Sequence, residues 1–141
     1  MTSPKVESAP SVEDVVAVAS FRTALRRFLR RSERIARASG LTPQRHLLLL
    51  MIKGAPDGSE QATVTDLAER LQLAQSTVTE LVGRAEEAGL IEREPSARDG
   101  RVANLRLTEE GERRLVRAFT DHGTERAQLL EAFSQLASPD D

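Results

Sequence analysis

A stripe of apolar and small side chains predicts one long helix over residues 11–40. Its members recur at alternating spacings of three and four residues, namely Val18, Phe21, Leu25, Phe28, Ser32, Ile35 and Ser39. Ser11 is typical of an N-cap, and Gly40 is typical of the residue just after a helix. A helix of about 28 residues is about 42 Å long, which exceeds a small domain. We therefore expect Val18, Phe21, Leu25 and Phe28 to pack on a second copy of the chain, as a dimerisation surface.

Three further helices are predicted before residue 90. The first begins with Thr42 as N-cap and Pro43 at its first position. Its run from Leu47 to Ile52 is apolar on all sides, which indicates a core helix. Residues 54–61 form a polar loop. Two short helices follow, over residues 65–71 and 76–88, around a turn at residues 72–75. They are expected to turn inward Leu67, Ala68, Leu71, Val78, Leu81, Val82 and Ala85.

The rest of the chain predicts a β-hairpin and a last helix. Strands are expected at residues 90–94, stopped by Pro95, and at residues 102–107, joined through the hairpin signal Asp99-Gly100. Thr108 caps a helix that bends near residues 121–123 and continues to about residue 137. The fold class is thus mainly α with a small β-hairpin. A tail (1–10) precedes a winged helix-turn-helix (41–107), flanked by N- and C-terminal dimerisation helices (11–40 and 108–141).

The second helix of the helix-turn-helix has the size and polarity of a DNA-reading helix. A B-DNA major groove is about 12 Å wide and admits one α-helix. The face expected to be exposed carries Gln75, Ser76, Thr77, Thr79 and Arg84. Glu80 on the same face repels phosphates unless it meets a cytosine amino group or pairs with a nearby arginine. Gly83 lowers helix propensity by about 1 kcal/mol relative to Ala, which suits a close approach of the backbone. The alternative is that these polar residues only solvate an exposed helix.

The predicted hairpin tip carries two arginines, Arg98 and Arg101, on either side of Asp99 and Gly100. An arginine at such a tip is able to enter the narrow, negative minor groove. We interpret Asp99 as an internal partner that orients an arginine. The alternative is a solvated turn that happens to be charged.

Composition narrows the possible chemistry. The chain has 141 residues and no Cys, and its two His stand far apart, so we expect one folding unit and no metal or thiol chemistry. No apolar run approaches the roughly 18 residues of a transmembrane helix, and the first ten residues lack the apolar stretch of a signal peptide. We expect a cytoplasmic protein without a membrane partner or cofactor. No nucleophile–base pair or phosphate loop suggests an enzyme.

Charge is unevenly distributed. The net charge is −2, yet 18 of the 20 basic residues are Arg, whose planar fork suits phosphates and base edges. Residues 62–107 hold six Arg against eight acids, whereas residues 12–39 hold seven Arg against three acids. The arginines of the first helix either approach phosphates or pair with acids of the last helix. The acidic balance of residues 62–107 motivates an alternative function, a winged-helix module that binds protein instead of DNA.

Several motifs resemble the MarR family of bacterial transcriptional regulators. They are TVTDLAERLQL (63–73), STVTELVGRAEEAGL (76–90), the wing residues Asp99-Gly100-Arg101 and LTEEG (107–111). The resemblance implies a homodimer that represses genes by binding double-stranded DNA at a pseudo-palindromic site. Each recognition helix would enter a major groove, and Arg101, braced by Asp99, would enter the minor groove.

The resemblance also implies an effector and a mode of dimerisation. Many members release DNA when a small aromatic or phenolic compound binds, and an anionic one would favour Arg45 or His46 here. Members usually carry another dimerisation helix after a segment like Ser138–Asp141. We therefore expect the first helix and Leu115–Leu136 to carry more of the dimer interface.

Overall fold

The computed structural model describes residues 9–95 and 101–137 and divides the chain into two compact units. One unit comprises the described residues up to 31 and those from 122 onward, and the other comprises residues 32–121. The sequence predicted one folding unit. In the structure the N- and C-terminal helical segments form a unit of their own, because apolar side chains of the two segments pack together.

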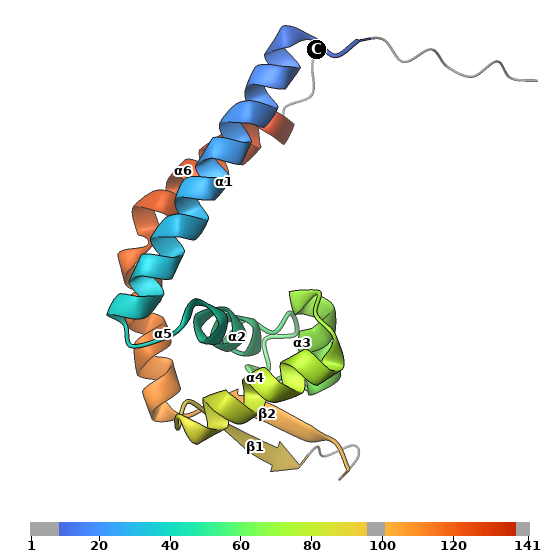
Figure 1. Cartoon of the computed structure of the whole chain (residues 1–141), viewed down its shortest axis with the longest axis vertical. Helices are drawn as coiled ribbons and strands as arrows, with labels where there is room; N and C mark the ends of the chain where they lie inside the picture. The colour runs from blue at the N-terminus through green and yellow to red at the C-terminus, as the bar shows by residue number, and fades with distance from the viewer. Residues whose placement is uncertain (1–8, 96–100, 138–141) are drawn as a thin grey trace, which may run out of the picture. The chain divides into compact units, whose positions relative to one another are not determined.

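The first unit pairs the part of helix α1 (Val12–Ala38) up to Arg31 with helix α6 (Gly123–Ala137), and the two run side by side in Figure 1. The ring centroids of Phe21 and Phe133 lie 6.3 Å apart, and Phe28 stacks on His122 at 4.3 Å. The Ser11 hydroxyl accepts a hydrogen bond from the Asp14 backbone N–H at 3.1 Å, which confirms the predicted N-cap.

The second unit is built around a single apolar core. It contains α2 (Pro43–Lys53), α3 (Val64–Leu71), α4 (Gln75–Glu87), β1 (Ile91–Pro95), β2 (Ala103–Leu107) and α5 (Glu109–Asp121). The largest fully buried side chains come from all parts of this unit, namely Leu48, Leu49, Ile52, Leu67, Leu90, Leu105, Val78 and Val82. Each such burial stabilises the fold by about 1.5–3 kcal/mol. The predicted mainly α fold with a β-hairpin is confirmed.

The junction between α1 and α2 follows the sequence signals. Gly40 has φ +76°, a left-handed conformation that glycine adopts without strain. The Thr42 hydroxyl accepts from the Arg45 backbone N–H at 3.1 Å, and Pro43 opens α2. The prediction that α2 is a core helix is confirmed by Leu48, Leu49 and Ile52, although its apolar run is not buried throughout. Leu47 is 43% exposed, because α2 presents only one face to the core.

The helix-turn-helix begins earlier than predicted. Thr63, rather than a residue at 64 or 65, is the N-cap of α3. Its hydroxyl accepts from the Asp66 backbone N–H, and the Asp66 carboxylate accepts from the Thr63 backbone N–H, both at 3.1 Å. Gln72 adopts a left-handed φ of 56° in the turn, and α4 then begins at Gln75. Leu71 and Leu81, which were predicted to face inward, are half-buried.

The two strands form an antiparallel hairpin in which Ile91 pairs with Leu107 and Pro95 with Ala103. Pro95 was predicted to stop the first strand but lies within it. A two-stranded sheet has only edge strands, where a missing N–H is tolerated. Ala62 adds a short bridge to Leu105, with N–O distances of 3.1 and 2.8 Å.

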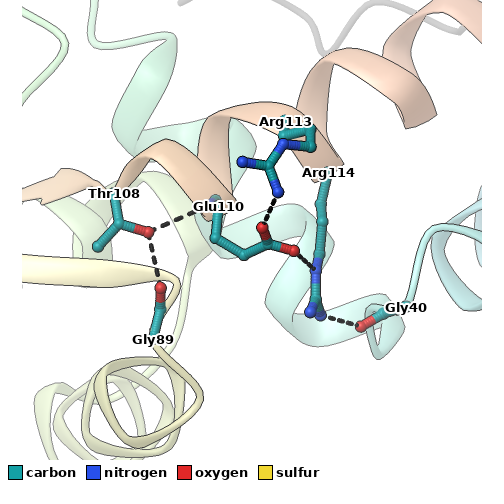
Figure 2. A network of polar contacts seen from close by, with 7 residues as sticks. Gly40, Gly89, Thr108, Glu110, Arg113 and Arg114 are labelled. Atoms are coloured by element: carbon teal, nitrogen blue, oxygen red, sulfur yellow. Dashed lines mark hydrogen bonds and ion pairs between the residues drawn. The ribbon is translucent and has the colours of Figure 1, made fainter.

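Helix α5 is fastened to its neighbours by a polar network (Figure 2). The Thr108 hydroxyl donates to the Gly89 carbonyl at 2.7 Å and accepts from the Gly111 backbone N–H at 3.1 Å, which confirms the predicted cap. The Glu110 carboxylate accepts from Arg113 and from Arg114, and Arg114 also donates to the Gly40 carbonyl at 2.8 Å. The hydrogen bond from Arg114, with the charge of Arg113, lowers the pKa of Glu110.

The predicted bend in the last helical segment is a break. Helix α5 ends at Asp121, and α6 begins at Gly123. His122 stands between them, 5% exposed.

Candidate nucleic-acid interface

Helix α4 buries one side and exposes the other, as the pattern predicted. Val78, Val82 and Ala85 are buried in the core. The candidate DNA-reading residues are all exposed, namely Gln75, Ser76, Thr77, Thr79 and Arg84. They therefore share one accessible face of a single helix, the part of a helix-turn-helix that contacts base edges.

The N-terminal end of this face is prearranged by α3. The Gln75 amide nitrogen donates to the Thr65 hydroxyl at 3.3 Å, which links the first residue of α4 to α3. The same residues line a shallow hollow of about 390 Å³, together with Ala68, Glu69, Gln72 and Leu73. No side chain caps the first turn of α4 at Ala74. The backbone N–H groups of that turn thus keep the partial positive charge that favours an anion.

Glu80 is paired within the helix. Its carboxylate lies 2.8 Å from the Arg84 guanidinium, one turn further along α4. This is one of the two arrangements that were predicted to make an acid tolerable on a candidate DNA-reading helix. Both side chains are highly exposed, so the pair contributes only about 0.3–0.5 kcal/mol, and Arg84 is able to exchange Glu80 for a phosphate or a base.

Two further acids of the winged region form internal ion pairs. Besides Glu80, Glu86 pairs with Arg93 at 2.8 Å, and Glu94 pairs with Arg106 across the hairpin at 3.3 Å. Each pair joins one acid to one arginine, so the excess of two acids over residues 62–107 remains.

The wing contributes one candidate to the described part of the chain. Arg101 is exposed at the start of the returning strand. The other two wing candidates, Arg98 and Asp99, lie outside the described residues.

The remaining candidate residues lie on other elements. On α2, Arg45 is half-buried and His46 is 8% exposed. On α1, Val18 is 48% exposed, whereas Phe21, Leu25 and Phe28 are half-buried. Two residues of the predicted dimerisation stripe therefore make contacts within the same chain, Phe21 with Phe133 of α6 and Phe28 with His122.

Sequence reasoning missed two residues that shape the interface. Thr65 was taken as the start of a helix, yet it orients Gln75. Arg70 donates to the Met51 and Gly54 carbonyls, at 2.5 and 3.0 Å, and so ties α3 to the end of α2. The T-x-x-D pattern at Thr63 and Asp66 would have located the start of α3, but no local signal marks Arg70, whose partners are distant in sequence.

Among the described residues, no group of three or more His, Asp or Glu side chains is placed to hold a metal ion. No helix in the same part of the chain is long and apolar enough to cross a membrane.

Part of the chain is similar to a known protein family. A family model described as MarR family matches residues 39–102. The transcriptional repressor MdtR of Bacillus subtilis (strain 168) is 37% identical over 73 residues, which are 52% of this chain and 44% of the relative. The chain spans about half the length of the curated relatives it matches.

Solved structures agree with the fold. The MarR family transcription regulator SP03579 superposes with a TM-score of 0.66 at 26% identity, covering 88% of this chain and 77% of the other. Sco3205 of Streptomyces coelicolor, a MarR family regulator solved in complex with DNA, gives 0.65 at 22% identity, covering 90% and 79%. The matched segment contains α2, α3, α4 and β1, and the returning strand and flanking helices complete the same architecture. Residues 39–102 are therefore similar to the MarR family, and the chain has the winged helix-turn-helix fold of the MarR family structures it matches.

Proposed function

We propose that this protein is a sequence-specific, double-stranded DNA-binding transcriptional regulator that acts as a homodimeric repressor. The observation that carries the proposal is the exposed polar face of α4, where Gln75, Ser76 and Thr79 stand clear of a well-packed core. Gln75 suits adenine, and the Thr79 methyl suits the thymine methyl. Arg84 suits guanine or a phosphate. The relative MdtR is named a repressor, and the relative Sco3205 was solved with DNA.

Selection of bound sequences from a random duplex pool tests this proposal directly. We expect enrichment of two related half-sites about 10–10.5 base pairs apart, the spacing that two recognition helices of a dimer impose. Thr79→Ala should change the enriched bases at one position of each half-site. A Ser76→Glu, Thr79→Glu variant, which repels phosphates without touching the core, is the negative control.

Failure of the selection has a defined meaning. If no sequence is enriched at low salt, α4 does not read DNA, and the protein-binding winged-helix module becomes the better account. If sequences are enriched but Thr79→Ala weakens all of them equally, the assignment of base reading to this face is wrong.

We further propose that a small anionic aromatic or phenolic compound releases the protein from DNA through Arg45 and His46. The support is that Arg45 is half-buried on α2 and forms no ion pair with any described residue. Benzoate and salicylate are suitable probes in a DNA-release assay. Arg45→Gln should raise the concentration needed for release, and equal release from the variant would contradict this role.

A further inference from the structure

Helix α1 carries a dense group of exposed arginines that form no ion pair with another described residue. In the first unit these are Arg22, Arg26, Arg27 and Arg30, here called the α1 arginine strip. All four are exposed, and none has a hydrogen bond, ion pair or ring contact with another described residue. The neighbouring Arg31 is different, because it pairs with Glu125 of α6 at 3.5 Å. Within the described residues, α6 therefore forms an ion pair with one arginine of this run and with none of the strip.

The spacing of the arginines in the strip destabilises helix α1. Arg22, Arg26 and Arg30 are separated by four residues each, so their side chains are neighbours on one helix face. Like charges at that spacing destabilise a helix by about 0.2–0.5 kcal/mol per pair. The strip also lies away from the apolar stripe of α1, since 100° per residue places Arg26 and Arg30 to one side of Leu25 and Phe28. Packing within the unit thus gives no reason for the strip.

We propose that the α1 arginine strip is a second, sequence-independent surface for the phosphates of double-stranded DNA. The strip spans about 12 Å along α1. B-DNA presents one phosphate charge per roughly 1.7 Å of its axis, so several phosphates match this length. Arginine, rather than lysine, supplies every charge of the strip, and its planar fork binds phosphate oxygens in pairs.

A membrane surface fits these residues less well. A helix that lies on a bilayer inserts its apolar face between the lipids. In this chain part of the apolar face of α1 is covered, by the contacts of Phe21 with Phe133 of α6 and of Phe28 with His122. The exposed apolar residue nearest to the strip is Leu29, which is 51% exposed, whereas the strip itself offers four positive charges, which a rigid, densely charged polyanion complements. The strip is separate from the α4 face and does not depend on the function proposed for that face.

The test measures binding of the full chain to a 30-base-pair duplex of arbitrary sequence across a salt series. Each lost phosphate contact reduces the slope of log K against log salt by about 0.9. We expect the triple variant Arg22→Gln, Arg26→Gln, Arg30→Gln to reduce the magnitude of that slope by about 2–3. The same variant should bind at least tenfold more weakly at low salt. The matching triple Lys variant should retain most of the slope, because the charge remains.

Controls separate this effect from net charge and from folding. Arg117→Gln removes an exposed, unpaired arginine of α5 and should leave the slope unchanged, whereas Arg26→Gln alone should lower it by about 0.9. The Gln variants should melt no lower than the parent, since they relieve like-charge repulsion. An unchanged slope in the triple Gln variant would overturn the proposal, and so would equally strong strip-dependent binding to polyglutamate or to phosphatidylserine vesicles.

The outcome is distinguishable from failure of the proposed regulator function. A chain that selects a DNA sequence but shows no strip-dependent slope refutes the strip alone. If the chain selects no sequence, but substitution of the strip reduces the slope of log K against log salt, base reading by α4 is refuted and the strip is supported.

Discussion

Gly111 lies where α5 passes the main chain at Leu90, and a Cβ built there would stand 2.2 Å from the Leu90 carbonyl oxygen. Main-chain atoms cannot yield as a flexible side chain does. We predict that Gly111→Ala destabilises the fold by about 1–3 kcal/mol, as overpacking does. Urea unfolding followed by circular dichroism measures the change.

Gly83 in α4 provides the matched control for that substitution. A Cβ there would meet nothing within 4 Å. Gly83→Ala should therefore stabilise the chain by up to about 1 kcal/mol through helix propensity. If both substitutions shift the unfolding midpoint in the same direction, the close contact at Leu90 does not determine the residue at 111.

Arg101 is the wing candidate within the described part of the chain, and it is exposed. We predict that Arg101→Ala weakens binding to the selected DNA by about 1–3 kcal/mol and leaves the melting temperature unchanged. Arg113→Ala, which removes an equally exposed arginine paired with Glu110, should not weaken DNA binding. Fluorescence anisotropy checks both, and an unaffected Arg101→Ala variant would remove the wing from the interface.

At the scale of elements, the start of α3 depends on one reciprocal pair of hydrogen bonds. Thr63→Ala removes the hydroxyl that accepts from the Asp66 N–H, and we predict a loss of about 1 kcal/mol in the free energy of unfolding. Thr63→Ser keeps the acceptor and should retain most of that stability. Equal losses in the two variants would indicate that the Thr63 methyl group, and not the cap, matters.

The link between α5 and α6 contains a buried histidine with a definite pH dependence. Burial is the main cause that lowers the pKa of His122 below its ordinary value of 6.5, and Arg126 and Arg31 act in the same direction. The Phe28 carbonyl, 3.3 Å from Nε2, and Glu125 oppose the shift. The folded chain thus favours the neutral ring, which stacks on Phe28.

The sign of the effect on stability follows from proton binding. Below pH 6.5 the unfolded chain takes up a proton at His122 before the folded chain does, so stability falls as the pH decreases toward the folded pKa. We predict that the melting temperature falls between about pH 7 and pH 5, and that His122→Phe, which keeps the ring stack, shows a smaller fall. Parallel curves for the two proteins would contradict a neutral, buried His122.

For the whole molecule, the proposed dimer is the property on which the proposed DNA binding would depend most. Leu25 is half-buried on the apolar stripe of α1, and a charge there would be costly to bury between two copies. We predict that Leu25→Glu yields monomers in sedimentation velocity and loses most of its affinity for paired half-sites. Thr23→Glu, on the opposite side of α1, should sediment like the parent. A dimeric Leu25→Glu variant would exclude this stripe as the interface.

Local signals predicted much of the fold because they act through neighbouring residues. The caps at Ser11, Thr42 and Thr108 and the glycine after α1 are each satisfied within a few residues. The exposed face of α4 followed from its helical period. The errors arose where contacts with residues distant in the sequence determine burial or strand pairing. Leu47 is exposed because the core meets only one face of α2, and Pro95 continues a strand because nothing pairs on its far side.

The sequence by itself determined the order of elements, the polar face of α4 and the arginine content of α1, since periodicity and caps are properties of adjacent residues. Only the tertiary structure decided which charged side chains form ion pairs. It pairs Arg31 with Glu125 and gives the α1 arginine strip no ion pair with any described residue. It also placed Gly111 against Leu90 and His122 against Phe28. Such contacts join residues far apart in the chain, so their distances exist only once the chain has folded.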